Sequence, residues 1–371
     1  MSVRKIAEWH DAGVIDAATR DAIIAYEAAH ARPLVLWAVW GIGALTIGLG
    51  FVSVVAANWE AIPGALRLAV HLALIAGLLA LLFLREDRLA AKSPWVVEAL
   101  VFITAALGLT FFGHLGQVYQ TSSPLWQPLA AWFALFAPML LLTGRSWPSA
   151  LAVVGGAVWA AWEYTTWATG FALNLWIALV MTAPVLLAPF AAWRRGRSAR
   201  SAFWRRLEQL ALAYAVGGAS SACALASAGG FDAGDAGAMA LRVAVAVLAG
   251  LGVAFARPGP SGQMAGAIIA GAGLVVPLAD GVDDVTIPAA LLFMALWAGI
   301  AAAALRAHWR GVFQLAVAVI ALRLIVLSFE LAGDLLGSGV GLILAGLMIL
   351  GVAWLAVRVS KRFAPDAEGA A

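Results

Sequence analysis

Long apolar segments alternate with short polar ones along almost the whole chain after Pro33. Most of these segments contain close to twenty residues, the length at which a helix crosses a hydrocarbon core of about 30 Å. The pattern predicts an all-α, polytopic transmembrane helix bundle with about 12 spans (10–12 possible), because 147–162 is short and 262–279 is rich in Gly and Ala. The candidate spans are 34–57, 65–84, 95–113, 126–142, 147–162, 171–193, 204–226, 239–256, 262–279, 286–305, 309–331 and 340–357.

Residues 1–33 are polar and precede the first span. Helical spacing predicts a first helix over about 3–11, which Gly13 ends, and a second helix that Asp16 caps and that runs to Ala31. The apolar positions that can pack this hairpin together are Ile6, Trp9, Ile23, Ile24 and Tyr26. We expect a small cytoplasmic packing or docking module, since no signal-peptide apolar region precedes the first span.

Composition supports the membrane class. The chain of 371 residues is 64% hydrophobic and only 12% charged, with a mean hydropathy of +0.94. A soluble domain of this length would need far more polar surface. The 17 Trp residues suit the two membrane interfaces, where indole rings are enriched. With Cys223 as its single cysteine, the chain can form neither an internal disulfide nor a thiolate metal cluster.

A loop with six arginines, 194–206, lies near the middle of the chain. Such a loop must face water, and the positive-inside rule places it in the cytoplasm. Of the 23 Lys and Arg residues, only Arg67 and Arg242 then fall on outer segments, and only Arg323 falls within a span. The charge pattern therefore predicts a multi-pass protein of the bacterial inner membrane with both its N-terminus and its C-terminus in the cytoplasm.

This basic loop also divides the chain into two membrane halves of about six spans each, 34–193 and 207–357, followed by a basic to polar tail, 358–371. The basic inner face is what a lipid bilayer with anionic headgroups attracts. We expect the bilayer, and no nucleic acid, to be its partner.

Three polar groups fall in the predicted outer half and are candidates for ligand binding. Asn58, Trp59 and Glu60 follow the first span. They could shape an external site, or they could form an ordinary helix end with an indole at the interface. Gln117, Tyr119 and Gln120 follow the third span. They suit a short re-entrant turn that binds a polar ligand, or an amphipathic loop.

The third group centres on Arg323, deep in span 309–331, with Glu330 on the same helix face. Seven residues separate the two by about 10 Å along the axis, which we take as too far for direct pairing. A buried arginine needs a partner, and Glu163 and Asp334 are the candidates. The arginine could serve a structural ion pair or a substrate or proton site.

Three further ionisable residues lie in or near spans. Glu98 and Glu208 are close to the cytoplasmic ends of their spans, where we expect them to reach water, and His71 lies in the outer half of its span.

Motifs for catalysis, metals and cofactors are absent from the sequence. It contains no His-Glu-x-x-His, no Gly-x-Ser-x-Gly and no Cys/His ligand set, so we expect neither enzymatic activity nor a bound metal or cofactor. The many glycines within spans, such as Gly266, Gly271 and Gly273, suit close packing of helices better than nucleotide binding.

Three stretches resemble one known family. They are Trp9 and Gly13 with Asn58-Trp59-Glu60, then Gly116-Gln117-x-Tyr119-Gln120 with Leu125-Trp126, and last Arg323, Phe329-Glu330 and Asp334-Leu335-Leu336. At these positions the chain is similar to bacterial membrane proteins of domain of unknown function 2157, while 150–305 is similar in hydropathy alone. The resemblance implies a polytopic inner-membrane protein that works with other small membrane proteins. It implies no catalytic residue.

Two functional hypotheses remain. The span number, the central basic loop and the buried arginine suit a transporter or permease-like protein with an outward-facing polar site, although fold-level likeness alone does not establish transport. The alternative is a non-transporting scaffold or sensor, which would engage partner proteins through the N-terminal hairpin and the outer loops. Dry packing of Arg323 against one carboxylate would favour the scaffold, and a water-filled polar cavity would favour the transporter.

Overall fold

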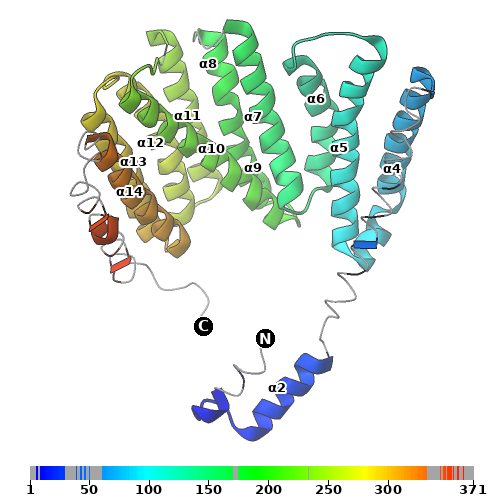
Figure 1. Ribbon diagram of the computed structural model, residues 1–371, viewed down its shortest axis with the longest axis horizontal. Helices are drawn as coiled ribbons and strands as arrows, with labels where there is room; N and C mark the ends of the chain where they lie inside the picture. Colours follow the sequence, from blue (N-terminus) through cyan, green and yellow to red (C-terminus); the bar gives the residue numbers. More distant parts are fainter. Residues whose placement is uncertain are drawn as a thin grey trace. The chain divides into compact units, whose positions relative to one another are not determined.

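The computed structural model describes residues 9–29, 61–169, 174–232 and 234–331, together with Ile6 and isolated positions between 39 and 50 and between 343 and 362. The described residues fold into helices joined by turns, without a strand among them (Figure 1). The chain divides into two compact units, Met1–Arg67 and Leu68–Ala371.

The first unit contains helix α2, Ala17–Ala29, preceded by a turn. Gly13 takes a positive φ of 70° there, which glycine adopts without steric cost. Asp16 accepts a hydrogen bond of 2.7 Å from the backbone N–H of Thr19, as an N-cap does. Hydrogen bonds from Thr19 also hold the pKa of Asp16 below its ordinary value. The predicted break at Gly13 and cap at Asp16 are both confirmed.

The helices that follow are α4 (Gly64–Lys92), α5 (Pro94–Tyr119), α6 (Trp126–Thr143), α7 (Trp147–Thr169), α8 (Leu175–Thr182), the 3-10 turn η1 (Ala183–Leu186), α9 (Leu187–Arg195), α10 (Ser201–Ala228), α11 (Ala236–Ala256), α12 (Pro260–Asp280), α13 (Thr286–Arg306) and α14 (Arg310–Leu331). Nine segments in the described part of the chain are long and apolar enough to cross a membrane. The prediction of an all-α, polytopic membrane fold is therefore confirmed.

Three predicted spans are not among those nine segments. Span 147–162 is present as α7, which is 23 residues long but more polar than its neighbours. Most of span 34–57 and half of span 340–357 lie outside the described residues. A fourth predicted span, 171–193, is among the nine segments as Leu175–Arg195, but its helix is interrupted by a 3-10 turn that begins at Ala183 and contains Pro184. Proline lacks the N–H that would continue the α-helical hydrogen bonds.

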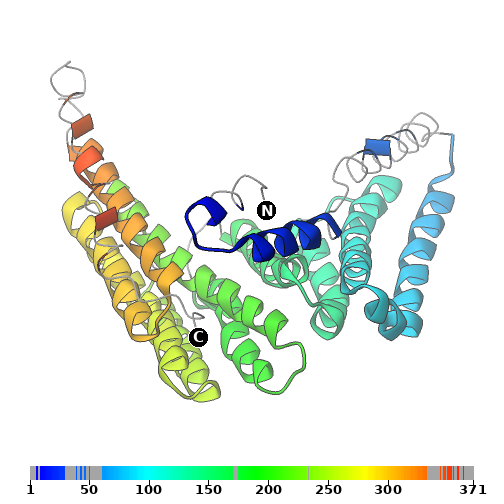
Figure 2. The same cartoon turned by 90° about the horizontal axis from the view of Figure 1, so that it is seen from below.

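Within the second unit, helices that are neighbours in sequence mostly pack side by side, as short loops favour. Figures 1 and 2 show α11, α12, α13 and α14 packed in this order. Helix α10 joins the two membrane halves, because it packs against α7 and α9 as well as α12 and α13. Its aromatic end, Phe203 and Trp204, is buried with α5–α7, and its Val216–Ala226 stretch is buried with α12–α14.

Small residues let the backbones of α11 and α12 pack closely against each other. A side chain at Gly266 would overlap the carbonyl oxygen of Gly250, and a side chain at Gly250 would overlap that of Gly266. Gly273 packs in the same way against Ala246. Gly271 faces open space instead. The predicted packing role therefore holds for Gly266 and Gly273 but not for Gly271.

Candidate functional site

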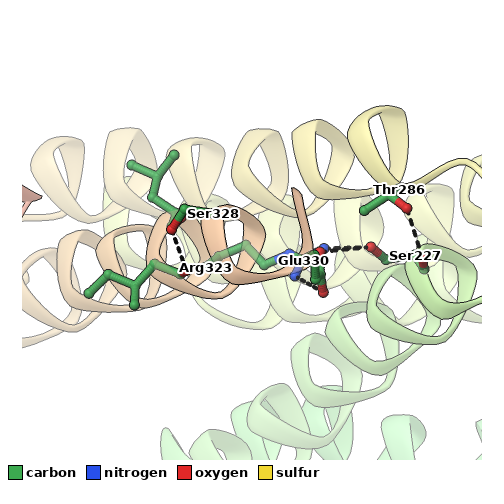
Figure 3. A network of polar contacts seen from close by, with 7 residues as sticks. Ser227, Thr286, Arg323, Ser328 and Glu330 are labelled. Carbon is green, nitrogen blue, oxygen red and sulfur yellow. Dashed lines mark hydrogen bonds and ion pairs between the residues drawn. The ribbon is translucent and has the colours of Figure 1, made fainter. Parts of the chain in front are cut away.

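The candidate site centres on Arg323. This charged residue lies in the membrane-spanning helix α14, and its side chain is only 7% exposed. Its Nη1 donates to Oε1 of Glu330 at 2.8 Å, and its Nη2 donates to Oγ of Ser227 at 2.6 Å. Figure 3 shows these side chains converging from α14 and α10. One carboxylate and one hydroxyl thus hold the buried guanidinium, which would otherwise be costly within a membrane.

The expectation that Arg323 and Glu330 are too far apart to pair is wrong. The seven-residue rise separates their backbones, but side chains of both residues cover that distance. The Glu330 side chain leans toward the N-terminus of its helix, as helical side chains do, and the long arginine side chain extends to meet it.

Ser227 completes the network and was not singled out from the sequence. Its hydroxyl lies 3.4 Å from Oε2 of Glu330, and its carbonyl accepts a bond of 3.4 Å from the Thr286 hydroxyl at the start of α13. The site therefore ties the end of α10 to both α13 and α14 (Figure 3). A serine near a helix end is common, so no sequence signal distinguished it.

The other predicted ligand residues that the structure describes do not join this site. Helix α5 continues through Gln117 to Tyr119, so no re-entrant turn forms there. Gln120 ends the helix with a φ of 51°, and its side-chain amide donates to the Gln117 carbonyl at 2.7 Å. All three side chains are exposed. The sequence placed the end of this helix before Gly113, whereas the helix accommodates both Gly113 and Gly116 in its last two turns.

Glu163 does not pair with Arg323. It accepts a hydrogen bond of 3.0 Å from the indole Nε1 of Trp159, one turn earlier in α7. Asn58, Trp59 and Glu60, and the other proposed partner, Asp334, lie outside the described residues.

A second polar network involves Glu98, which is 5% exposed. Its carboxylate accepts hydrogen bonds from the backbone N–H of Arg145 at 2.9 Å and from the hydroxyls of Ser146 and Ser149, both at 2.5 Å. The carboxylate thus neutralises the positive N-terminal end of α7. The expectation that Glu98 reaches water is wrong, because this helix end draws the carboxylate inward.

Glu208 is likewise buried, at 3% exposure, rather than in water. It pairs with Arg195 at 3.5 Å and with Arg257 at the end of α11. Two arginines thus enclose one carboxylate, and the pairing ties α10 to the ends of α9 and α11. The error has a simple origin: the sequence does not show which distant loop supplies a partner.

Arg200 and Arg206, both from the basic loop 194–206, stabilise the turn between α6 and α7. Arg200 donates to the carbonyl oxygens of Leu141 at 2.9 Å and Gly144 at 2.7 Å, which the end of α6 leaves without helical partners. Burial lowers the pKa of the Arg200 guanidinium. Arg206 donates to the carbonyl of Arg145 at 2.7 Å.

Two histidines also meet between helices. Nδ1 of His71 on α4 lies 3.3 Å from Nδ1 of His114 on α5, and Nε2 of His71 lies 3.0 Å from the carbonyl oxygen of Leu107. This pair links α4 to α5. Elsewhere, the described residues bring together no group of three His, Cys, Asp or Glu side chains that could hold a metal ion.

Comparison with known proteins gives one match. Residues 7–149 match a family described as "Predicted membrane protein (DUF2157)". This match confirms the resemblance inferred from the sequence over the N-terminal unit and the helices through the α6–α7 turn. No curated protein and no solved structure matches the chain. The Arg323 site lies beyond the matched residues.

Proposed function

Starting from a multi-pass membrane protein whose residues 7–149 match the DUF2157 family, we propose a non-transporting membrane scaffold or sensor that catalyses no reaction. The observation that carries this proposal is the pairing of Arg323 with one carboxylate and one hydroxyl of packed helices. The hydrogen bond from Arg323 to Ser227 fastens α14 to α10, while Glu330 of the same helix balances the charge of the arginine, which is what a structural role requires. Gln117, Tyr119 and Gln120 are exposed on a different helix, so they add no polar lining to this site.

The transporter hypothesis retains one specific observation in its favour. Glu330 is 34% exposed, whereas its partner Arg323 is 7% exposed. A proton or a cationic solute that reached the carboxylate could therefore compete with Arg323 for it, and ionisable groups within membranes often serve this purpose. Transport is therefore the second candidate function.

The surface that supports partner binding lies in the N-terminal unit. Val14, which precedes α2, is 70% exposed, and Tyr26, within α2, is 64% exposed. Large apolar side chains exposed on a small polar helical segment suit contact with another protein. We propose that another small membrane protein binds there.

In-cell cross-linking tests the scaffold. With a photo-reactive residue in place of Val14, we expect one discrete adduct with another small membrane protein. Tyr26→Asp should reduce that adduct at least about tenfold, because a charge in an apolar contact costs more than about 1.4 kcal/mol. Ala25→Asp, the same charge on the neighbouring exposed position, should leave it unchanged. The measurement is the adduct yield on immunoblots of equal amounts of full-length protein.

A thermal-shift screen of the purified protein against metabolites and ions tests the transporter hypothesis. A ligand that binds the folded state raises its melting temperature by mass action. The scaffold proposal fails if such a ligand is found and its shift disappears in the Arg323→Leu/Glu330→Leu double variant. It also fails if the Val14 adduct is insensitive to Tyr26→Asp.

We further propose that the protein lies in the bacterial inner membrane with both ends in the cytoplasm. Cys223 is buried, and a Cys223→Ala background allows single cysteines to be placed in two loops. With an impermeant maleimide on intact cells, Asp232→Cys should be labelled and Ala199→Cys should be labelled only after the membrane is opened. Labelling of Ala199→Cys in intact cells would reverse the proposed orientation.

A further inference from the structure

Two arginines of the basic loop lie over the rings of two tryptophans, Trp193 near the end of α9 and Trp204 in the first turn of α10. The guanidinium of Arg194 lies 5.8 Å from the ring centre of Trp193 and 5.3 Å from that of Trp204. The guanidinium of Arg197 lies 4.9 Å from the same Trp193 ring. Two positive charges thus share one indole, and Trp193 is 44% exposed. Stacking on an aromatic face holds a guanidinium in place and leaves its N–H groups available at the edge.

Three of the neighbouring arginines are committed to internal contacts. Arg195 pairs with Glu208, Arg200 binds the carbonyl oxygens at the end of α6, and Arg206 binds the Arg145 carbonyl. Arg194 and Arg197 form no ion pair with any carboxylate among the described residues; Arg197 donates only to the Trp193 carbonyl, at 3.3 Å. Two adjacent like charges repel each other, so a site with these two residues favours an anion.

The position of the pair identifies the source of that anion. Arg194 is next to the last residue of the membrane-spanning segment Leu175–Arg195, and the next such segment begins at Ser201. The pair therefore lies at a membrane boundary, at the depth of lipid headgroups, where indole rings are also favoured. Arginine binds phosphate through two parallel N–H bonds.

We propose that Arg194 and Arg197, held on Trp193 and Trp204, bind the phosphodiester headgroup of an anionic phospholipid. The indoles fix the height of the two guanidinium groups at the membrane surface. A zwitterionic headgroup binds less tightly, because its own ammonium group offsets the phosphate charge. This site is independent of the partner contact proposed for the N-terminal unit.

Native mass spectrometry of the delipidated, full-length protein tests this site with phosphatidylglycerol and phosphatidylethanolamine of identical acyl chains. The wild-type protein should bind phosphatidylglycerol more tightly. Arg194→Gln/Arg197→Gln should raise the apparent Kd for phosphatidylglycerol roughly 30-fold, since each arginine near a membrane surface contributes about fivefold. Binding of phosphatidylethanolamine should change little. Arg194 also contacts the buried Trp204, so its substitution can affect folding. Arg197 is exposed, and Arg197→Gln alone should weaken the affinity for phosphatidylglycerol about fivefold.

The matched control is Arg306→Gln/Arg310→Gln, which removes two exposed arginines from the α13–α14 turn. It should leave the Kd for phosphatidylglycerol unchanged. An equal loss in this control would show attraction by net charge alone and would overturn the site. The proposal is also overturned if Arg197→Gln has no effect, or if inorganic phosphate displaces phosphatidylglycerol at equal concentration, which would indicate a site for a free anion.

Discussion

Glu330→Ala is expected to destabilise the protein by about 3 kcal/mol, the lower end of the range for breaking a buried ion pair. The substitution leaves the guanidinium of Arg323 in the helix bundle without its carboxylate. The lower end applies because Glu330 is 34% exposed, so water can partly replace the lost oxygens. The free energy of unfolding, measured by titration with a denaturing detergent in mixed micelles, checks this value.

The control for this prediction removes both charges. Arg323→Leu/Glu330→Leu should be close to neutral in stability, because replacing a whole buried pair with apolar side chains leaves no unpaired charge. If Glu330→Ala proves as stable as the wild type, the pair does not hold α14 in place. The structural role on which the scaffold proposal depends would then be lost.

Gly266→Leu is expected to destabilise the protein by about 3 kcal/mol, at the upper end for overpacking a well-packed core. A β-carbon at this position would overlap the carbonyl oxygen of Gly250, so α11 and α12 would have to separate along their contact. In a membrane, such close backbone contact is a main source of helix association. The same detergent titration measures the effect.

Gly271→Leu provides the matched control on the same helix. Nothing lies within 4 Å of a β-carbon at Gly271. This substitution should be neutral or slightly stabilising, because leucine has a higher helix propensity than glycine. Equal losses at the two positions would mean that the added side-chain bulk in itself, and not the contact with α11, sets the cost.

The positions of the helices could be predicted from the sequence much more completely than the contacts between helices. A run of apolar residues forms a helix through local hydrogen bonds, so its existence depends on the segment itself. Span 204–226 therefore appears within α10. The extension of α5 to Tyr119 is an error at a boundary, where competing local preferences are small. Span 171–193 is found as Leu175–Arg195, with an interruption in its middle at Pro184.

The candidate site was predicted only in part. Arg323 was identified because a charge within an apolar run is conspicuous, and Glu330 because it shares a helix face. Ser227 comes from another helix, almost a hundred positions away, and nothing in the sequence indicates which helices meet. The same reason explains Glu98 and Glu208. Because both residues lie near span ends, we expected them to be in contact with water. In the folded protein, Glu98 binds the N-terminal end of a helix and Glu208 pairs with two arginines.

The contacts of Arg200 and Arg206 have a consequence for biosynthesis. The turn that joins α6 to α7 receives its hydrogen bonds from residues that are translated more than fifty positions later. While the ribosome is still producing α8 and α9, the carbonyl groups of Leu141, Gly144 and Arg145 have only water or the insertion machinery as partners. The amino-terminal membrane half therefore gains these three contacts only after the first turns of α10 have emerged.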